Sequence, residues 1–407
     1  MSVPQRIVIV GAGLGGASAA ATLREQGFSG EIVVLGSETH QPYELPPLTK
    51  GLLLGDTDEP DWVRGADFWR EHDVDLRLGT TATRLELGAR LVLDGNGDEH
   101  RYDRLLLAMG SQPRQIPVPG ADFPGVRTVR TLDDSLGLRS AFGSTERLVI
   151  IGAGWIGTEA AAAARRHGVD VTVVDQIDGP LLPVLGPEVS RVFQDLHAEH
   201  GVHWRLGSGV AELTGSPEGV RGVRLADGSE LPADLVLVAV GVKPRVELAH
   251  AAGLELADAG GVAVDAGLRT AAPDVYAVGD IAAHFHPRYG RRVRVEHWAN
   301  AKNQGTHVAR NLAGEHEPYL SAPYFFSDQY DLGCEYRGLA DLDTDEVVIR
   351  GDLAKREFIA FWLRDGEVTA AMNVNAWDDG DALKALVDKR ATVTPQQLRE
   401  ADLAGLA

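Results

Sequence analysis

The chain has 407 residues, which is too long for one ordinary hydrophobic core, so its length predicts two or three domains. Hydrophobic residues (44%) and charged residues (24%) are in the proportions of a soluble globular protein. The formal net charge of −20 argues against binding of the chain as a whole to nucleic acid or to an anionic membrane surface.

The single cysteine, Cys334, cannot form a disulfide within the chain, and it excludes a metal site built from two or four cysteines. A lone thiol indicates a reducing compartment. No segment offers about 18 uninterrupted apolar residues, so we expect no membrane span. Together these observations predict a cytoplasmic protein.

The first forty residues predict a βαβ unit. The short run Arg6–Val10, rich in Ile and Val, is typical of a parallel strand that is buried on both faces. The turn Gly11-Ala-Gly-Leu-Gly-Gly16 follows, and after it come an alanine-rich helix to about Gln26 and a second strand at Glu31–Leu35.

The same arrangement recurs later in the chain. It has a strand at Arg147–Ile151, the turn Gly152-Ala-Gly-Trp-Ile-Gly157, a helix carrying Ala160–Ala164 and a strand at Val171–Val174. Two nucleotide-binding halves in one chain are therefore the main structural prediction.

Between the two units the pattern predicts strands at Asp75–Leu78, Arg90–Leu93 and Arg104–Ala108. Prolines at positions 113, 117, 119 and 124 then indicate a crossing between domains. The run Asp234–Val240, which ends at Gly241, indicates the return crossing.

Beyond Gly290 the pattern predicts a helix over Trp298–Leu312, and past Pro323 it changes to short alternating strands and a final helix. These last elements are expected at Val347–Arg350, Phe358–Leu363, Val368–Asn373 and Ala382–Val387. The predicted fold class is α/β, with two Rossmann-like nucleotide-binding domains and a small α+β domain at the C-terminus.

The two glycine turns have the chemistry of a dinucleotide site. In Gly-x-Gly-x-x-Gly the first glycine permits a tight turn, the second lets the backbone approach a pyrophosphate, and the third lets helix and strand pack closely. The glycines that fit are Gly11, Gly13 and Gly16 in the first unit and Gly152, Gly154 and Gly157 in the second. A plain strand–helix turn is the alternative, but each turn here follows a strand and opens a helix, as the motif requires.

An acidic residue about 20 positions after the first glycine is expected to bind ribose hydroxyls. In the second unit Asp175 ends the strand, and the three residues after it include no Arg or Lys to hold a 2′-phosphate, so the sequence favours NADH over NADPH. In the first unit the strand ends before Ser37 and Glu38. Glu38 is the candidate there, and the alternative is a solvated turn residue.

Further motif blocks are spread over the whole chain: Pro42-Tyr-Glu-Leu-Pro-Pro-Leu-Thr-Lys50, Leu107-Ala-Met-Gly-Ser-Gln-Pro-Arg114, Gly154-Trp-Ile-Gly-Thr-Glu159, Thr270-Ala-Ala-Pro-Asp-Val-Tyr-Ala-Val-Gly-Asp280, Arg294-Val-Glu-His-Trp-Ala-Asn300 and Pro323-Tyr-Phe-Phe-Ser-Asp-Gln329. In this order they resemble the FAD-dependent ferredoxin reductases of bacterial oxygenase systems. The resemblance implies a glutathione-reductase-like arrangement, with the NAD domain inserted in the FAD domain. The implied domains are 1–115 with 246–320 for FAD, 116–245 for NAD, and 321–407 for the C-terminal α+β domain.

The resemblance also implies the site residues. The candidates for FAD are Gly11, Gly13, Leu14, Gly16, Ser37, Glu38, Lys50, Ala82, Ala108, Gly110, Arg130, Asp280, Glu296, His297 and Trp298. The candidates for NAD are Gly152, Gly154, Trp155, Ile156, Gly157, Glu159, Asp175 and Gly241. Asp280 would bond to the ribityl or pyrophosphate part of FAD, and it is also placed to cap a helix over the residues that follow. Without the resemblance, Lys50 and Arg130 would be interpreted as surface cations.

Lys50 and Glu159 are the predicted catalytic residues, because the resemblance places Glu159 near the nicotinamide and close to Lys50. An ion pair between them would gate stacking of the nicotinamide. The alternative for Glu159 is a carboxylate favoured by a helix N-terminus. No nucleophile or general base is required, because the cofactors carry the redox chemistry while the protein aligns them.

The sequence departs from its relatives at Phe325 and Phe326, where they usually carry Trp, at Met109, where they carry Thr, and at Ser37, where an acid is common. Disulfide reductases of related fold need a cysteine pair beside the flavin, and other thiol-dependent relatives need one cysteine near Tyr43–Pro47. Since the chain has neither, thiol-based chemistry is excluded and Cys334 is expected to be a buried small hydrophobe.

The expected function is NADH:ferredoxin oxidoreductase, in which a hydride passes from NADH to FAD and single electrons pass to a [2Fe–2S] ferredoxin that serves a P450 or Rieske oxygenase. The arginines predicted to dock this ferredoxin lie in a hairpin-like segment and are Arg288, Arg291, Arg292 and Arg294, with a solvated loop as the alternative. A monomer is expected.

No metal site is predicted, because the spacing of His197, His200 and His203 does not place all three on one helical face. Two other functions stay open. One is a flavin-dependent NADH oxidase or quinone reductase, and the other is a redox-sensing binding protein like apoptosis-inducing factor.

Overall fold

In the computed structural model, which describes residues 4–406, the chain divides into two compact units. The first unit contains the residues up to Leu45, Asp61–Gln112 and Lys243–Pro323. The second contains Pro46–Pro60, Pro113–Val242 and the residues from Tyr324 onward. Two of the points at which the chain passes from one unit to the other lie inside short strands, β8 (Ser111–Pro113) and β17 (Val242–Pro244).

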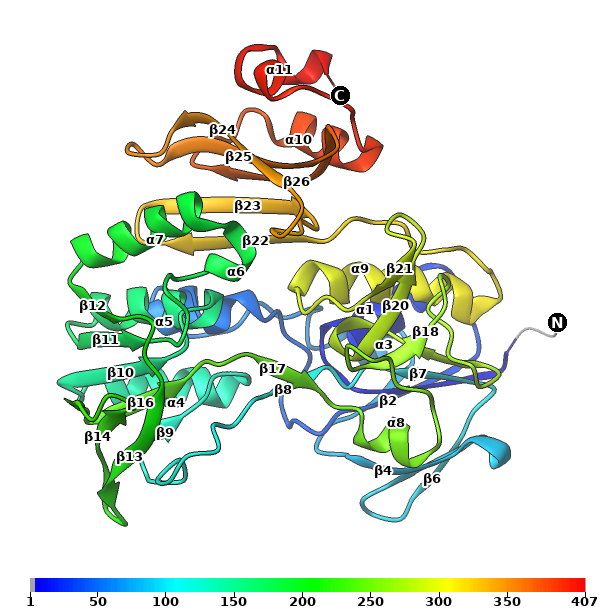
Figure 1. Ribbon diagram of the computed structural model, residues 1–407. Coiled ribbons are helices and arrows are strands. Elements are labelled where there is room, and N and C mark those ends of the chain that lie inside the picture. The colour runs from blue at the N-terminus through cyan, green and yellow to red at the C-terminus, as the bar shows by residue number, and fades with distance from the viewer. Residues whose placement is uncertain (1–3, 407) are drawn as a thin grey trace. The chain divides into compact units, whose positions relative to one another are not determined.

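The core of the first unit is a five-stranded parallel sheet. In spatial order its strands are β19 (Val275–Ala277), β7 (Arg104–Leu107), β1 (Arg6–Val10), β2 (Glu31–Leu35) and β3 (Val74–Arg77). The central strands are unbroken runs of Ile, Val and Leu because both of their faces are buried. Helices α1 (Leu14–Glu25) and α9 (Trp298–Ala313) pack against each other and contribute Leu23, Val308 and Leu312 to the same core (Figure 1).

Two small three-stranded sheets complete the first unit. Their strands are β4 (Ala82–Glu86), β5 (Leu91–Asp94) and β6 (Glu99–Arg101) in one, and β18 (Val262–Val264), β20 (Ala282–His286) and β21 (Arg291–Val293) in the other. The short helices of this unit are α3 (Phe68–Glu71), α8 (Glu247–Ala251), η2 (Leu87–Ala89) and η3 (Gly279–Ile281).

The second unit repeats the parallel sheet with five strands in the order β12 (Val202–Arg205), β11 (Asp170–Val174), β10 (Arg147–Ile151), β16 (Leu235–Val238) and β9 (Val126–Arg127). An antiparallel sheet packs on it through Leu213 and Val223, and its strands are β13 (Val210–Ser216), β14 (Gly219–Leu225) and β15 (Glu230–Pro232). The helices are η1 (Pro46–Leu48), α2 (Gly51–Leu54), α4 (Leu132–Phe142), α5 (Trp155–Arg166), α6 (Leu182–Leu185) and α7 (Pro187–Glu199).

The last part of the chain adds a five-stranded antiparallel sheet to the second unit (Figure 1). In spatial order its strands are β22 (Tyr324–Gln329), β23 (Leu332–Gly338), β26 (Glu367–Val374), β25 (Glu357–Arg364) and β24 (Glu346–Asp352). Val189 and Phe193 of α7 share one apolar cluster with Phe325 and Trp362 of this sheet. The closing helices are α10 (Gly380–Lys389), α11 (Pro395–Glu400) and η4 (Leu403–Gly405).

The predicted α/β fold class is confirmed, and both predicted βαβ units are present with β1, β2 and β10 at the expected residues. The sequence did not predict β22 and β23. In β22 the buried positions carry Phe325, Ser327 and Gln329, so the strand lacks the apolar alternation that identifies a half-buried strand.

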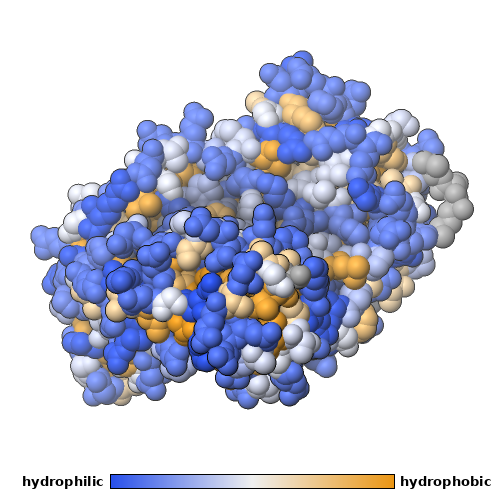
Figure 2. Space-filling model, turned by 90° about the horizontal axis from the view of Figure 1, so that it is seen from above, coloured by the Kyte–Doolittle hydropathy of each residue, from blue (hydrophilic) through white to orange (hydrophobic). Residues whose placement is uncertain are grey.

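None of the helices within residues 4–406 is long and apolar enough to cross a membrane. The face of the molecule in Figure 2 is mostly hydrophilic, with scattered hydrophobic patches.

The contact between α1 and α9 leads to a stability prediction. A Cβ added at Gly305 would lie 2.2 Å from the carbonyl O of Gly15, so Gly305→Ala must push the two helices apart. We expect it to lower the free energy of unfolding by roughly 1–3 kcal/mol.

In α4, a Cβ at Gly137 meets no other residue within 4 Å. Gly137→Ala should therefore raise the free energy of unfolding by about 0.5–1 kcal/mol. Differential scanning calorimetry measures the melting temperatures of both variants. If both melting temperatures shift in the same direction, the close contact at Gly305 does not explain the difference between the two glycines.

Candidate functional site

The first glycine turn joins β1 to α1 at the carboxyl edge of its sheet. β1 lies between β2 and β7, so the strand order reverses here, which is where open α/β sheets bind ligands. A Cβ on Gly16 would lie 2.0 Å from the carbonyl O of Gly11, so only glycine lets α1 begin this close to the strand. Gly11 itself has a φ of +112°, which favours glycine. In contrast, no atom of the described chain beyond its own neighbours lies within 4 Å of a Cβ at Gly13.

The second turn, between β10 and α5, has the same geometry. β10 lies between β11 and β16, Gly152 has a φ of +111°, and a Cβ on Gly157 would lie 2.0 Å from the carbonyl O of Gly152. Gly154 faces open space among the described residues, as Gly13 does. Each turn therefore has two glycines that let helix and strand approach and one that leaves room in front of a helix N-terminus. This arrangement fits the pyrophosphate of a dinucleotide.

Asp175 lies beside the second turn. Its Oδ2 accepts a hydrogen bond from the backbone N–H of Ala153 at 2.7 Å, and its Oδ1 accepts one from that of Ile177 at 2.9 Å. Residues 176–178 bring no cation to this edge of the sheet. The carboxylate is thus held where a ribose is expected, and the residues that directly follow it carry no cation for a 2′-phosphate, although Arg205 ends the neighbouring strand β12.

In the first unit the expected ribose acid is less closely tied to the turn. Ser37 and Glu38 are both exposed, and Oε2 of Glu38 accepts a hydrogen bond from the Tyr43 hydroxyl at 2.6 Å. Glu38 is therefore oriented by a neighbour, although it does not contact the glycine turn in the way that Asp175 does.

Four other flavin candidates lie in the first unit. Ala108 and Gly110 follow β7 beside the first turn, and the carbonyl O of Ala108 is the atom that a Cβ on Gly11 would meet at 2.3 Å. Ala82 lies at the start of β4, in a separate sheet. Asp280 is buried in η3, just after β19. The alternative that Asp280 caps a helix is wrong, because the N-cap of η3 is Val278 and the residues after η3 form strand β20.

Glu296, His297 and Trp298 lie at the start of α9. Glu296 forms an ion pair with Arg294, and burial lowers the pKa of His297 to about 4, so its ring is neutral at neutral pH. The indole N–H of Trp298 donates to Glu44, whose other carboxylate oxygen lies 3.0 Å from the ammonium of Lys302. The Trp298 ring is therefore held by a carboxylate in a fixed orientation.

The structure brings the two predicted catalytic residues together. Nζ of Lys50 lies 2.6 Å from Oε1 of Glu159, and the side chains are 15% and 6% exposed. Oε1 also accepts a hydrogen bond from the Ser327 hydroxyl at 2.6 Å, and Oε2 accepts one from the Thr49 hydroxyl. A carboxylate buried this far needs such partners, because it has lost most of its water.

Thr49 and Ser327 were not among the residues predicted from the sequence, although both lie inside quoted motif blocks, 42–50 and 323–329. Their positions next to Lys50 and Phe326 were the available signal. Neither position could be linked to Glu159 without knowing which segments meet.

Lys50 belongs to the second unit because contacts with two helices, α4 and α5, hold segment 46–60 there. The guanidinium of Arg139 donates to the carbonyl O of Thr57 at 2.9 Å, and that of Arg166 forms two hydrogen bonds with Asp56, at 3.1 and 2.5 Å. Nε2 of His167 lies 3.0 Å from the carbonyl O of Leu53. Arg130, the other cationic flavin candidate, also lies in the second unit, where its backbone N–H bonds to Asp134 at the start of α4.

One aromatic ring lies beside Lys50, and two others meet at the start of α5. The ammonium of Lys50 lies 5.2 Å from the centre of the Phe326 ring, within cation–π range. The ring of Trp155, in the first turn of α5, meets that of Phe325 edge-on at 4.8 Å. The remaining NAD candidates, Ile156 and Gly241, lie in α5 and just before β17.

Cys334 is 1% exposed in the apolar cluster of the last sheet, as expected, and burial raises the pKa of its thiol. The three histidines considered for a metal go to different places: His197 lies in α7, His200 at its C-cap and His203 in β12. Among residues 4–406 no group of His, Cys, Asp and Glu is arranged to hold a metal ion.

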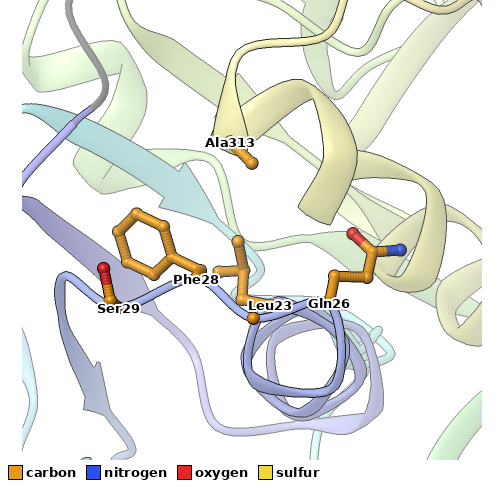
Figure 3. A pocket seen from close by; sticks show the side chains of 6 residues that line it. Leu23, Gln26, Phe28, Ser29 and Ala313 are labelled. Atoms are coloured by element: carbon orange, nitrogen blue, oxygen red, sulfur yellow. The ribbon is translucent and has the colours of Figure 1, made fainter.

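A cavity of about 210 Å³ lies at the other end of α1 from the glycine turn (Figure 3). Leu23, Gln26, Phe28 and Ser29 line it together with Ala313 at the end of α9. None of the residues that line it is a predicted site residue, so the cavity is not part of the site.

Residues 5–305 match the family Pyridine nucleotide-disulphide oxidoreductase, and residues 324–405 match the family Reductase C-terminal. The chain belongs to the pyridine nucleotide-disulphide oxidoreductase family. It is similar to rhodocoxin reductase from Rhodococcus erythropolis, with 37% identity over 397 residues that cover 97% of this chain and 92% of the relative.

Two solved structures are similar over nearly the full length. A ferredoxin reductase for the CYP199A2 system from Rhodopseudomonas palustris has a TM-score of 0.95 and 36% identity, and the match covers 99% of this chain and 100% of that one. Putidaredoxin reductase, in its covalent complex with putidaredoxin, has a TM-score of 0.93 and 35% identity, with 98% and 97% covered. The predicted membership among the ferredoxin reductases is confirmed, and proteins of this family use FAD and NAD(P)H.

The open space at Gly154 leads to a binding prediction. In Gly154→Ala the new methyl group meets no other described residue within 4 Å, so the melting temperature should stay unchanged. The methyl group would occupy the space of the pyrophosphate, so NAD⁺ affinity should fall by roughly tenfold or more, a cost of about 1.4 kcal/mol. Isothermal titration calorimetry measures the affinity. Unchanged NAD⁺ affinity in a folded Gly154→Ala variant would show that the pyrophosphate does not bind at this turn.

Proposed function

We propose that this chain is an FAD-dependent ferredoxin–NAD(+) reductase that transfers a hydride from NADH to FAD and then single electrons to a [2Fe–2S] ferredoxin serving a P450 or Rieske oxygenase. The observation that carries the proposal is the duplicated glycine turn, one in each unit and each at a reversal of strand order, together with the buried Lys50–Glu159 pair in the second unit. The only cysteine of the chain is buried among apolar side chains, so a thiol intermediate has no candidate residue.

FAD, when bound, supplies the conversion between two-electron and one-electron transfer. The protein itself binds FAD and NADH and orients them. The backbone N–H groups at the starts of α1 and α5 would hold the two pyrophosphates, and Asp175 would accept hydrogen bonds from the ribose of NADH. Lys50 and Glu159 would lie beside the nicotinamide, where a charge-neutral pair limits water and fixes the direction from which the ring enters.

This function assigns a role to each part of the chain. We assign residues 1–115 and 246–320 to FAD binding, 116–245 to NAD binding and 321–407 to the C-terminal α+β domain. Most flavin candidates lie in the first unit and the NAD candidates lie in the second, which supports this assignment, whereas the flavin candidates Lys50 and Arg130 lie in the second unit. The lone thiol supports a cytoplasmic protein, and we propose a monomer as the simplest form of an electron carrier.

The arginines proposed to dock the ferredoxin differ in their surroundings. Arg291 and Arg292 are exposed on β21, although the guanidinium of Arg292 also donates to the carbonyl O of Val264. Arg288 is half-buried, and the charge of Arg294 is neutralised by Glu296. Arg291 and Arg292 are therefore the residues that should contribute most to attraction of an acidic partner.

Anaerobic stopped-flow absorbance tests the function directly. Mixing the purified protein with NADH should bleach the flavin quickly, NADPH should do so more slowly, and a [2Fe–2S] ferredoxin should then reoxidise it. Fast bleaching with electron delivery only to dioxygen or quinones would assign an oxidase or quinone reductase. Slow delivery to every acceptor would favour a redox-sensing binding protein, and absence of bound flavin would refute the proposal.

Charge reversal tests the docking site. Arg291→Glu with Arg292→Glu should raise the KM for ferredoxin by roughly tenfold at low salt, while reduction of a small dye stays unchanged. The matched control reverses Arg84 and Arg101, which are 69% and 70% exposed in the β4–β5–β6 sheet of the same unit, and should leave both activities unchanged. Equal changes in the ferredoxin KM of the two double variants would show that the net charge of the protein governs ferredoxin binding and that Arg291 and Arg292 are not a docking site.

A further inference from the structure

Two separate segments hold the carboxylate of Glu159. Lys50 and Thr49 come from segment 46–60 and bond to Oε1 and Oε2 respectively. Ser327 comes from β22, far along the chain, and its hydroxyl donates to Oε1 at 2.6 Å. Without Ser327 the carboxylate would be held by the loop segment alone.

The hydrogen bonds continue behind Ser327 through two more buried side chains. Gln329 lies two residues further along β22 and so on the same face of the strand, and its Nε2 donates to the Ser327 hydroxyl oxygen at 3.1 Å. Nε2 of His197, in α7, lies 2.7 Å from Oε1 of Gln329. Ser327 and Gln329 are each 1% exposed and His197 is 0% exposed, so bulk water does not compete for these bonds.

The chemistry of the groups sets the direction of each bond. An ionised carboxylate only accepts, so Ser327 donates its one hydroxyl hydrogen to Glu159 and must accept from Gln329. Gln329 then presents its amide NH₂ to Ser327 and its carbonyl oxygen to His197, so Nε2 of His197 must carry a hydrogen.

The state of His197 agrees with this direction. Burial lowers the pKa of His197 to about 4, so at neutral pH its ring carries one hydrogen. With that hydrogen on Nε2, Nδ1 is an acceptor, and no residue within 4–406 forms a hydrogen bond with it. All three donors therefore point toward Glu159, and hydrogen bonds in such a row polarise one another.

We propose that Ser327, Gln329 and His197 are positioning residues that hold the Glu159 carboxylate in the orientation required for nicotinamide binding and hydride transfer. The inference rests on the proposed function, in which Glu159 lies at the nicotinamide site. It gives strand β22, which belongs to the Reductase C-terminal match, a direct part in the use of NADH.

Ser327→Ala removes the last donor with little change in volume, and Ser327→Thr keeps the hydroxyl. Three quantities would be measured: the rate of flavin reduction by NADH in anaerobic stopped flow, the affinity for NAD⁺ by titration calorimetry, and the melting temperature. Ser327→Ala should slow flavin reduction roughly tenfold, because a lost hydrogen bond to a charged group and a displaced reacting group both have effects of this size. It should also weaken NAD⁺ binding. Ser327→Thr should retain most of the reduction rate and most of the NAD⁺ affinity. Gln329→Met should lower these two quantities less than Ser327→Ala does.

Thr369→Ala is the matched control, since it removes a hydroxyl that donates to Asp345 at 2.6 Å in the same sheet. It should leave the reduction rate and NAD⁺ affinity unchanged even if the melting temperature falls. Wild-type rate and affinity in Ser327→Ala, or an equal loss of rate in Thr369→Ala, would overturn the inference.

Glu159→Gln separates this inference from the function on which it rests. If Glu159→Gln loses rate and NAD⁺ affinity while Ser327→Ala does not, only the positioning role is wrong. If Glu159→Gln behaves as wild type, Glu159 is not at the nicotinamide site, and both its proposed role and the positioning inference are wrong.

Discussion

A buried carboxylate determines how the second unit is assembled. Glu159 is 6% exposed, and an ionised carboxylate in such a place is tolerated only if charges and hydrogen bonds replace its water. The replacements come from Thr49, Lys50 and Ser327, which are far from Glu159 in the sequence. One charge therefore joins segment 46–60, helix α5 and strand β22, and together with the contacts of Arg139, Arg166 and His167 it holds this short segment in the second unit.

The second constraint is the close approach of strand and helix at each glycine turn. At Gly16 and Gly157 the space for a Cβ is already filled by a carbonyl oxygen 2.0 Å away, while Gly13 and Gly154 leave the space in front of the helix open. Within each motif of three glycines, the first and the third let strand and helix approach closely, while the second leaves space for a ligand. Because the two turns are so alike, what distinguishes their ligands must lie outside them, and the surroundings of Asp175 and Glu38 already differ.

The redox chemistry proposed for this chain requires orientation more than reactive side chains. Its only thiol is buried, its histidines at 197 and 297 are neutral at neutral pH because burial lowers their pKa values to about 4, and its charged pair is neutral as a whole. The indole N–H of Trp298, at the start of α9, donates to the carboxylate of Glu44, and the carboxylate of Glu159 accepts from Ser327, so a hydrogen bond to a carboxylate fixes each of these two side chains. Fixed geometry is what a protein contributes when the cofactors carry the reaction.

The sequence alone determined the two βαβ units and the strands between Val347 and Asn373, because apolar periodicity and glycine chemistry are local properties of the chain. It also identified Lys50 and Glu159 as a pair through resemblance. Tertiary structure alone decided that β22 is a strand, since its buried positions at 327 and 329 are polar and are satisfied by Glu159 and His197. It likewise decided that Asp280 lies in η3 and that segment 46–60 joins the second unit. The physical reason is the same in each case: a polar side chain can be buried only where a distant segment supplies its partner, and no local pattern records which segments meet.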